Sequence, residues 1–454
     1  MKNLFVRSIR WDITNACNLS CMHCYAPKGK NTDIGYDSVI KIIARIMPFG
    51  LKEINFSGRE PTMRKDIFRI IKWCREKGLT INMTTNGTLM EPIMIRQIIN
   101  SGINMLVFSL DGPDAETHDK IRGLGNFSKT VENIKVLKSN MDEPGSRSKI
   151  GISCTLQKFN INCIQGMIDL CDSLGVDLLA INPVSFCGSA LDAVSELYVD
   201  SDDIFTGWEE ICKRYKKIQP DFEIYLGIYP MEAKYLNLKH NMNLPVIHTG
   251  CSAGQTLYIN AQGYALPCYM LPPVSDIVVD ISKYVKYWDV LNESVQYAAS
   301  IFEPFINFTV NHNHKNINGC ESCPDVPVCK RCPLISMSDP DAVKRCQQTR
   351  DRIALTKPKL DPDSVLKIKP IVRHELFKNK LIINIKDGSY TSEKTFELNP
   401  FSKRIWNEMS KARSVRQISD TINKRFSKLS PEERESSLLE CIDYFLKEGV
   451  ISIN

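Results

Sequence analysis

Three cysteines near the start of the chain constrain it more than any other feature. Cys17, Cys21 and Cys24 follow directly after a strand-like alternation of apolar and polar residues at Val6–Thr14. Three closely spaced thiolates suit a 4Fe–4S cluster in which one iron has no protein ligand and stays open to another molecule. A structural zinc site would need a fourth protein ligand, and none stands nearby in the sequence. The spacing therefore predicts an iron–sulfur cluster with an open iron.

The cysteine count supports metal ligation. The chain has 17 cysteines in 454 residues, and its net charge is +6. In a reducing cytosol so many thiols indicate metal ligands rather than disulfides. Ten of the cysteines fall in three spaced groups, and we expect the other seven to be small buried core residues: Cys74, Cys154, Cys163, Cys171, Cys187, Cys212 and Cys441.

Charge and hydropathy limit the possible partners. The mildly basic charge would suit an acidic peptide or a phosphate-bearing ligand, and it does not require nucleic acid. No apolar run approaches the roughly 20 residues that a membrane helix needs. The N-terminus does not resemble a secretory signal. We expect a cytoplasmic protein with no membrane partner.

Strand and helix alternate along residues 6–230. This pattern predicts an α/β fold of parallel βα units, closed or partly closed into a partial (βα)6 TIM-like barrel. In such a barrel the residues just after the strands line the active face. The predicted strands are Val6–Thr14, Glu53–Ser57, Thr80–Thr85, Met105–Leu110, Ile150–Leu156 and Leu178–Pro183, and the helices between them include Ser38–Phe49, Asp66–Lys77, Pro92–Asn100 and Lys129–Lys138.

Beyond the barrel the pattern changes twice. Periodicity fades over about 245–350, where cysteines predominate, and 351–366 contains Lys-Pro and Asp-Pro steps typical of a linker. The last part resembles a winged helix, with strands at Ile371–Phe377, Leu381–Ile385 and Thr395–Leu398 and then three helices. We therefore expect a barrel at 1–235, a cysteine-rich auxiliary domain at 236–350, a linker at 351–366 and a winged-helix domain at 367–454.

Around the cysteine triad the sequence resembles the radical S-adenosylmethionine (SAM) superfamily. The resemblance is carried by Cys17, Cys21 and Cys24 with His23, Ser57-Gly58-Arg59-Glu60-Pro61, Thr85-Asn86-Gly87, Ser109-Leu110-Asp111-Gly112, His118 and Arg122-Gly123. It implies SAM contacts at His23, Gly58, Arg59, Glu60, Asn86, Ser109, Asp111 and Arg122. The family's second glycine is replaced here by Arg59, which would change how the backbone approaches SAM. Turn geometry explains each polar group alone, but not their shared position after successive strands.

The resemblance implies a mechanism. The reduced cluster cleaves SAM to methionine and a 5′-deoxyadenosyl radical, which removes a hydrogen from an unactivated carbon of the substrate. The protein positions the target C–H bond and excludes solvent. A low-potential electron donor such as flavodoxin or ferredoxin is then required.

The two other cysteine groups resemble the SPASM auxiliary-cluster module. By this likeness Cys251, Cys268 and Cys332 would hold auxiliary cluster I, and Cys320, Cys323, Cys329 and Cys346 would hold auxiliary cluster II. Together with the catalytic cluster this gives three 4Fe–4S clusters. A zinc ribbon is the alternative for the last group. Leu257 stands where the family often has a further cysteine, so cluster I is one thiolate short, unless Cys187 or Cys212 supplies it. Tyr269 replaces an aspartate base of sulfatase maturases, which argues against that activity.

The C-terminal domain resembles the PqqD-like recognition element of enzymes that modify ribosomally made peptides. The likeness lies in Phe396–Pro400, Ile405-Trp406 and the last two helices. It implies that a leader peptide adds as a strand along Thr395–Leu398. The alternative is a DNA-binding winged helix, for which Lys403, Arg404, Arg413 and Arg416 supply some basic character.

The sequence thus predicts a radical SAM enzyme that modifies a precursor peptide by a crosslink, an epimerisation or related C–H chemistry. One alternative is an enzyme of heme or quinone cofactor biosynthesis. Another, from a different class, is an iron–sulfur regulator that binds DNA. We do not expect nucleic acid as the partner, and the bond that is made in the substrate is not predicted.

Overall fold

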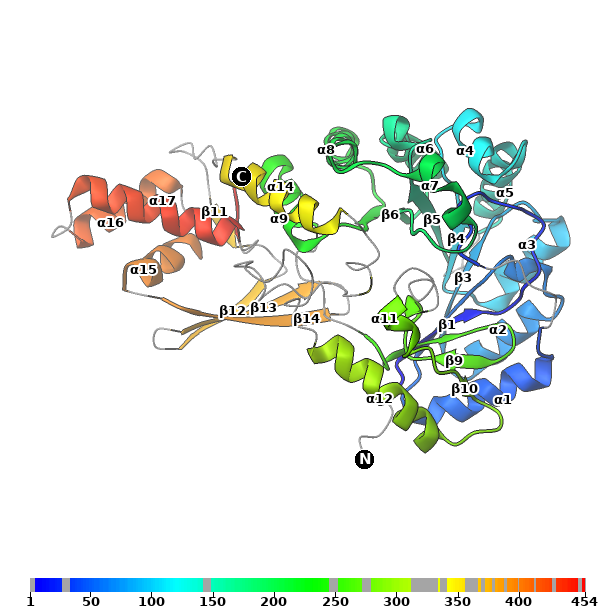
Figure 1. Cartoon of the computed structure of the whole chain (residues 1–454). Helices are drawn as coiled ribbons and strands as arrows, with labels where there is room; N and C mark the ends of the chain where they lie inside the picture. Colours follow the sequence, from blue (N-terminus) through cyan, green and yellow to red (C-terminus); the bar gives the residue numbers. More distant parts are fainter. Residues whose placement is uncertain are drawn as a thin grey trace. The chain divides into compact units, whose positions relative to one another are not determined.

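The computed structural model describes residues 5–26, 33–141, 148–244, 252–271, 279–311, 334, 341–355, 366–368, 372–377, 380–387, 390–398, 400–411, 414–426, 430–447 and 451–453. The chain divides into two compact units (Figure 1). The first comprises Met1–Gly227 and Gly250–Val343, and the second comprises Ile228–Thr249 and Lys344–Asn454. Each is described by itself.

A ten-stranded sheet forms the centre of the first unit. Its strand order is β10-β9-β8-β1-β2-β3-β4-β5-β6-β7. Strands β1 to β7 each run parallel to the next, β8 is parallel to β1, and β9 and β10 are antiparallel. The strands are β1 (Ser8–Asp12), β2 (Glu53–Ser57), β3 (Thr80–Thr85), β4 (Met105–Ser109), β5 (Lys149–Leu156), β6 (Leu178–Pro183), β7 (Glu223–Leu226), β8 (Thr256–Ile259), β9 (Tyr264–Leu266) and β10 (Trp288–Asp289). The predicted α/β fold with a parallel sheet is confirmed, and β7 to β10 are additions to the six predicted strands.

Helices cover the outer face of this sheet (Figure 1). Helix α1 buries Val39, Ile42, Ile43 and Ile46, whose spacing places them on one face of the helix. The outward side chains of β1, such as Trp11, are fully buried. The principal helices are α1 (Tyr36–Ile46), α2 (Ile67–Glu76), α3 (Pro92–Ser101), α4 (Ala115–Arg122), α5 (Asn126–Met141), α6 (Gly166–Leu174), α7 (Val194–Leu197) and α8 (Ser201–Ile218), with short 3-10 turns η1 (Met47–Phe49), η2 (Pro61–Met63), η3 (Ile161–Cys163) and η4 (Gly188–Ala193).

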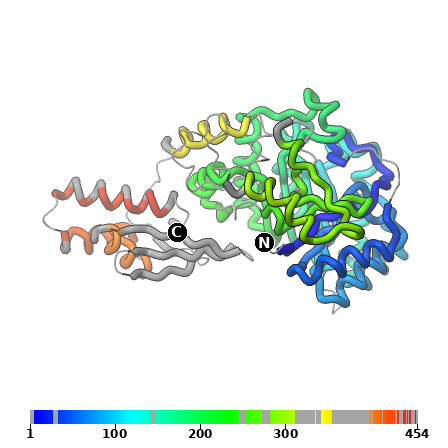
Figure 2. Tube along the Cα trace, turned by 60° about the horizontal axis from the view of Figure 1, so that its bottom comes forward, coloured from blue at the N-terminus to red at the C-terminus, as the bar shows by residue number. Residues whose placement is uncertain are grey.

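The other face of β1 is polar and forms part of the concave side of the sheet, called the lumen below. Ser8, Arg10 and Asp12 alternate with the buried apolar residues, as successive side chains of a strand point to opposite faces. Thr256 and Tyr258 of β8 are in register with Ser8 and Arg10. Figure 2 shows the N-terminal strand of the first unit in blue. The lumen is therefore lined on this side by two segments that are far apart in the sequence.

The region expected to be loop-rich contains regular structure in its described part. Helix α11 (Val279–Ser282) lies between β9 and β10 in the chain, and α12 (Val295–Asn311) follows β10. Cys268, Leu271 and Phe305 belong to a buried apolar cluster. Cys251, Cys320, Cys323, Cys329 and Cys332 lie outside the described residues.

The second unit contains the predicted C-terminal strands and helices. A three-stranded antiparallel sheet has the order β12-β13-β14, and β11 (Leu366–Ile368) pairs with β15 (Ile451–Ile453). Leu438, Ile442 and Phe445 are buried, as their helical spacing predicted. The remaining bounds are β12 (Val372–Phe377), β13 (Lys380–Asp387), β14 (Tyr390–Glu397), α9 (Pro230–His240), α14 (Ala342–Leu355), α15 (Pro400–Met409), α16 (Val415–Arg425) and α17 (Pro431–Lys447).

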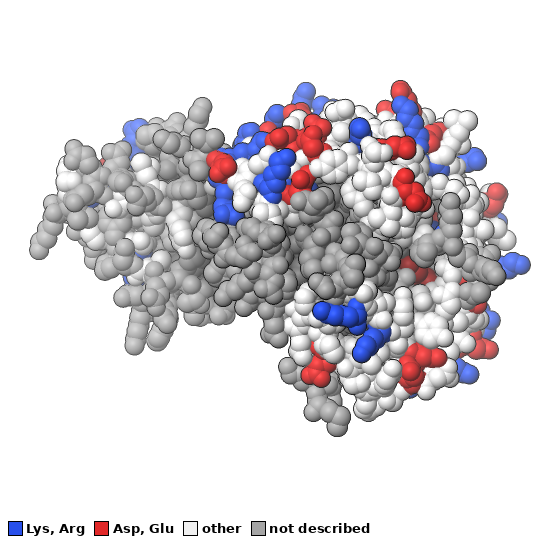
Figure 3. Space-filling view, in the orientation of Figure 1, with Lys and Arg blue, Asp and Glu red and all other residues white. Residues whose placement is uncertain are grey.

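Apolar length and surface charge are two further properties of the described residues. None of the described helices is long and apolar enough to cross a bilayer. On the face shown in Figure 3, basic and acidic side chains are interspersed. Among the described side chains of that face, the basic residues do not form one continuous patch.

Candidate active site

The cysteine triad lies in the loop that follows β1. Cys17, Cys21 and Cys24 are all partly exposed. The Cys24 amide donates to the Cys21 carbonyl over 3.2 Å, and the Leu19 amide donates to Cys17 Sγ over 3.4 Å. The Ser189 amide, at the start of η4, donates to the Cys24 carbonyl over 2.8 Å. The loop thus presents three thiols on a backbone that is fixed by hydrogen bonds.

Three cysteine thiols are a donor set that a 4Fe–4S cluster takes. Among the described residues, no three His, Cys, Asp or Glu side chains converge on one ion position. A 4Fe–4S cluster is larger than an ion and is held by cysteine thiolates around it. Burial raises the pKa of Cys21 to about 11, so its thiol keeps its proton at neutral pH until a metal displaces it.

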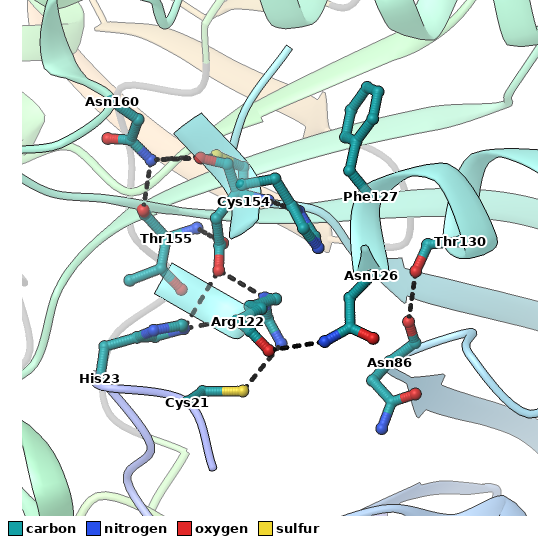
Figure 4. A network of polar contacts seen from close by, with 12 residues as sticks. Cys21, His23, Asn86, Arg122, Asn126, Phe127, Thr130, Cys154, Thr155 and Asn160 are labelled. Carbon is teal, nitrogen blue, oxygen red and sulfur yellow. Dashed lines mark hydrogen bonds and ion pairs between the residues drawn. The ribbon is translucent and has the colours of Figure 1, made fainter. Parts of the chain in front are cut away.

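A buried ion pair lies beside the triad (Figure 4). Arg122, at the end of α4, donates from Nε to Asp111 Oδ2 over 2.5 Å, and Asp111 is fully buried. Arg122 also lies 3.9 Å from Cys21 Sγ and 3.3 Å from His23 Nε2. His23 Nε2 is 3.3 Å from Asp111 Oδ2. Three of the predicted SAM-contact residues are therefore joined in one network that touches Cys21.

The network fixes the charge of its members. Burial alone would raise the pKa of Asp111, but Arg122 and His23 hold it below its usual range. Burial lowers the pKa of His23 to about 4, against the effect of Asp111, so the ring is neutral at pH 7. Burial lowers the pKa of His118 to about 4 as well, and its Nδ1 accepts from the Asp111 amide over 3.1 Å. The network contains one anion and one cation at neutral pH.

One nitrogen of this network has no hydrogen-bond partner among the described residues. His23 Nδ1 is buried and accepts or donates no hydrogen bond within the described residues, and the whole His23 side chain is only 9% exposed. Buried polar groups are normally satisfied, so such an atom indicates a missing partner. Its position between two cysteines of the triad suits a polar ligand that binds at the triad.

Glu60 connects the ends of β2 and β3. It is fully buried, and its Oε1 accepts from the Thr62 amide and hydroxyl and from the Thr85 hydroxyl, at 2.6–3.1 Å. Its Oε2 accepts from the Asn86 amide over 2.7 Å. Burial raises the pKa of Glu60, and these hydrogen bonds oppose the rise. Four donors within the chain already occupy this carboxylate.

Gly58 and Arg59 adjoin the cysteine loop. Gly58 has φ +104°, and a Cβ there would lie 2.9 Å from the Asp12 Cα, so only glycine fits. Arg59 Nη2 donates to the Ala26 carbonyl over 3.2 Å. The side chain that replaces the family's second glycine therefore reaches back to the end of the cysteine loop.

Asn86 and Ser109 occupy the ends of β3 and β4. Asn86 Nδ2 donates to Asn18 Oδ1 over 2.9 Å, which ties the third strand to the cysteine loop. The Asn86 carbonyl accepts from the Thr130 hydroxyl (Figure 4). Ser109 is half-buried, and its hydroxyl has no hydrogen-bond partner among the described residues. The structure thus brings every predicted SAM-contact residue to one edge of the sheet.

Five polar residues of this region were not predicted from the sequence. The Thr155 amide donates to Asp111 Oδ1, and Asn160 Nδ2 donates to the Asp111 carbonyl, over 2.8 and 2.9 Å. Asp12 accepts from Tyr25 and Tyr258 hydroxyls, each over 2.8 Å. Asp12, Thr155 and Asn160 could have been found from the sequence by their position at or near strand ends. Tyr25 could have been found because it follows Cys24 directly.

The auxiliary cysteines are described only in part. Cys268 is 9% exposed and its Sγ accepts from the Met270 amide over 3.4 Å. Cys346 lies on α14 and is partly exposed. Cys212 is fully buried on α8, and burial raises its pKa to about 12. Cys187 is 1% exposed, and its thiol donates to the Ser185 carbonyl. Cys187 and Cys212, the two candidates for the missing ligand of cluster I, therefore both have buried thiols.

Comparison with known proteins relates the part of the chain that carries the cysteine triad to a known superfamily. Residues 11–171 match the model of the radical SAM superfamily. The AdoMet-dependent heme synthase of Methanosarcina barkeri is 29% identical over 59% of this chain and 77% of its own length. The Fe-coproporphyrin III synthase of the same organism is 33% identical, over 41% of this chain and 46% of its own length. The chain thus spans less than half of that second relative.

Solved structures share the fold. Streptococcus suis SuiB bound to precursor peptide SuiA superimposes with a TM-score of 0.57, at 15% identity, over 76% of each chain. At this level of identity the likeness is one of fold.

Proposed function

We propose that this chain, an enzyme whose residues 11–171 form a radical SAM domain, modifies a ribosomally made precursor peptide. The observation that carries the peptide assignment is the second unit. Its three-stranded sheet leaves one edge of β14 unpaired by the described strands, and three helices follow. An open antiparallel edge is the structural requirement for adding a peptide strand.

Cys17, Cys21 and Cys24 are the proposed ligands of the catalytic 4Fe–4S cluster. Their partial exposure and their place at the carboxyl end of β1 support this assignment. When bound, the cluster and SAM supply a 5′-deoxyadenosyl radical that removes hydrogen from the substrate. The residues of the chain bind and orient SAM and keep water out.

The proposed SAM contacts follow from the unpaired and charged groups. His23 Nδ1 is the proposed partner of a polar edge of the adenine. The Ser109 hydroxyl and the Arg122 guanidinium are proposed for the SAM carboxylate and ribose. Because the Glu60 carboxylate is occupied by four donors, we assign the SAM ammonium to the backbone of Gly58–Glu60 rather than to free carboxylate oxygens. Asp111 and Asn86 position Arg122 and the cysteine loop.

Two auxiliary 4Fe–4S clusters complete the proposal. Cys251, Cys268 and Cys332 are assigned to cluster I, and Cys320, Cys323, Cys329 and Cys346 to cluster II. The buried positions of Cys187 and Cys212 favour leaving cluster I with an open iron. A low-potential donor such as flavodoxin or ferredoxin would reduce the catalytic cluster.

The catalytic assignment predicts a complete loss of SAM cleavage when its three ligands are removed. In Cys17→Ala/Cys21→Ala/Cys24→Ala, 5′-deoxyadenosine formation should disappear, and iron should fall from about twelve to about eight atoms per chain. The matched control is Cys74→Ala, because Cys74 is a fully buried thiol on α2, outside the loop. SAM cleavage by the triple variant would refute the assignment. Stoichiometric zinc in the wild type would favour a zinc ribbon at Cys320–Cys346.

The peptide assignment predicts that β14 can be blocked without harming the barrel. Successive amides of a strand point to opposite sides, so Thr395 and Glu397 share one side and Phe396 has the other. Glu397→Pro or Phe396→Pro, whichever faces the open edge, should abolish modification of the full-length precursor while SAM cleavage without substrate persists. Glu375→Pro in β12, the other outer strand of this sheet, is the matched control.

Deletion from residue 367 onward should have the same effect as the blocking proline. Adding the isolated region in trans should restore part of the turnover. If the truncated enzyme modifies the precursor as well as the intact chain does, the recognition role is wrong.

Cofactor biosynthesis is the second candidate, because the heme synthase relative aligns over 77% of its own length. Conversion of iron coproporphyrin III by the reconstituted enzyme, with no peptide present, would favour this candidate. Regulation through DNA has less support. Arg404, one of four basic residues that suggested it, pairs with the buried Glu408 over 2.8 Å.

A further inference from the structure

Arg10 is a cation on the lumenal face of the sheet. It lies in the middle of β1, two residues before Asp12, and it is exposed although it is in the central strand region. The adjacent strands β2 and β8, and strand β7 at the far end of the strand order, contain no other Lys or Arg. Arg10 is therefore the one cation in these four strands.

Arg10 has no hydrogen bond or ion pair among the described residues. Its guanidinium stacks instead on the ring of Tyr269, whose centroid lies 4.3 Å from the guanidinium carbon. The stacking holds the planar group and leaves its N–H donors free. Arginine is thus oriented without being neutralised.

The obvious internal partner is already satisfied. Asp12 Oδ1 accepts from Tyr25 over 2.8 Å and from Ser57 over 3.1 Å, and Oδ2 accepts from Tyr258 over 2.8 Å. Three hydroxyl groups therefore occupy the carboxylate that lies nearest to Arg10 along the strand. The guanidinium remains available to an external anion.

The space around Arg10 adjoins the cysteine loop. Burial raises the pKa values of Asp12, Tyr25 and Tyr225, and the charge of Arg10 lowers each of them in part. Tyr225 lies on β7, which is not adjacent to β1 in the sheet, and the charge of Arg10 still acts on it. Tyr25 follows Cys24 directly, which places this space beside the catalytic loop.

We propose that Arg10 binds a carboxylate of the substrate in the lumen and so positions the reacting carbon near the cysteine triad. A single planar guanidinium matches one carboxylate through two parallel hydrogen bonds. Phosphate groups usually recruit several cations or a helix N-terminus as well. The inference rests on the proposed function, under which the carboxylate belongs to an acidic residue of the peptide. A propionate of a tetrapyrrole has the same chemistry.

The test measures binding of defined probes to the reconstituted, SAM-bound enzyme at low salt. The probes are an acetylated Gly-Glu-Gly-Glu-Gly amide, the same peptide with glutamine in place of glutamate, iron coproporphyrin III and GTP. Arg10→Gln should weaken binding of the carboxylate probe at least about tenfold, and Arg10→Lys should weaken it less. Tyr269→Leu should weaken it about two- to fivefold. Arg69→Gln is the matched control, because Arg69 stacks on Tyr36 on the helical side of the unit.

Each outcome decides the proposal. Loss of glutamate-peptide binding in Arg10→Gln, with unchanged SAM cleavage in the absence of substrate, supports it. Arg10-dependent binding of coproporphyrin alone supports the carboxylate site and overturns the peptide as its source. The proposal is overturned if no carboxylate probe binds the wild type, if GTP or the glutamine peptide binds equally well, or if Arg10→Gln loses SAM cleavage. None of these results would contradict the radical SAM assignment, which the cysteine variants test.

Discussion

Two buried carboxylates flank the cysteine loop, and the chain satisfies them in opposite ways. Asp111, after β4, faces a guanidinium, whereas Asp12, at the end of β1, faces three hydroxyl groups. Both are nearly inaccessible, with 0% and 7% exposure. Burial would raise both pKa values, yet that of Asp111 is lowered and that of Asp12 is raised.

The difference shows that the charge of the donor decides the ionisation of these groups. A cation offsets the loss of solvation, while neutral hydroxyls offset it only in part. Asp111 is thus a permanent anion that anchors Arg122. Asp12 gathers Tyr25, Ser57 and Tyr258 and leaves a cation, Arg10, without an internal partner.

The largest expected effect follows from removing the anion of the first pair. Asp111→Asn leaves Arg122 buried and unpaired, which should cost about 3–5 kcal/mol of unfolding free energy and abolish SAM cleavage. Thermal unfolding and 5′-deoxyadenosine formation measure the two effects. Glu116→Gln on α4, the helix that carries Arg122, removes an exposed pair with Lys120 and should change neither. Equal behaviour of the two variants would mean that burial does not matter to the Asp111 pair.

A smaller effect, of opposite pH dependence, is expected at Asp12. Its folded-state pKa is raised above 3.8, so its contribution to stability is present below that pH and is lost as the pH rises through the folded value. Asp12→Asn removes this titration. The melting temperature of the variant minus that of the wild type should therefore increase from about pH 4 to pH 7. A constant or decreasing difference would show that Asp12 resembles Asp111, whose contribution is lost only in acid.

The smallest effect distinguishes the two tyrosines that hold Asp12. Tyr258→Phe removes the hydrogen bond to Oδ2 and should cost about 1–2 kcal/mol. Tyr25→Phe should cost less, because Ser57 still donates to the same oxygen, Oδ1. Thermal unfolding of the two variants measures the order, and a larger cost for Tyr25→Phe would point to a role of this ring beyond Asp12.

Local patterns predicted the regular part of the barrel. The bounds of Glu53–Ser57, Thr80–Thr85 and Leu178–Pro183 agree with the structure, because buried apolar residues alternate with less buried residues along five or six positions in each strand. Strand β7 is only four residues long, which is too short for such an alternation to stand out. Strand β8 is equally short, and its pairing with β1 depends on residues far away in the chain.

The same distinction applies to the site. Spacing indicated Cys17, Cys21 and Cys24 and the polar groups after each strand, including Asp111 and Arg122. It could not indicate that Tyr258 donates to Asp12, because the two are separated by 246 positions. Nor could it show that Glu60 is filled by donors of its own chain.

The pairing of β8 with β1 has a consequence for synthesis of the chain. Ser8 and Thr256 are 248 residues apart. At about 5–20 residues per second, roughly 12–50 s pass between their emergence from the ribosome. During that interval one edge of β1 lacks its final neighbour, and unpaired edges are sites of aggregation. We therefore expect the nascent first unit to depend on chaperones, or on slow translation, until the strand beyond residue 256 has docked.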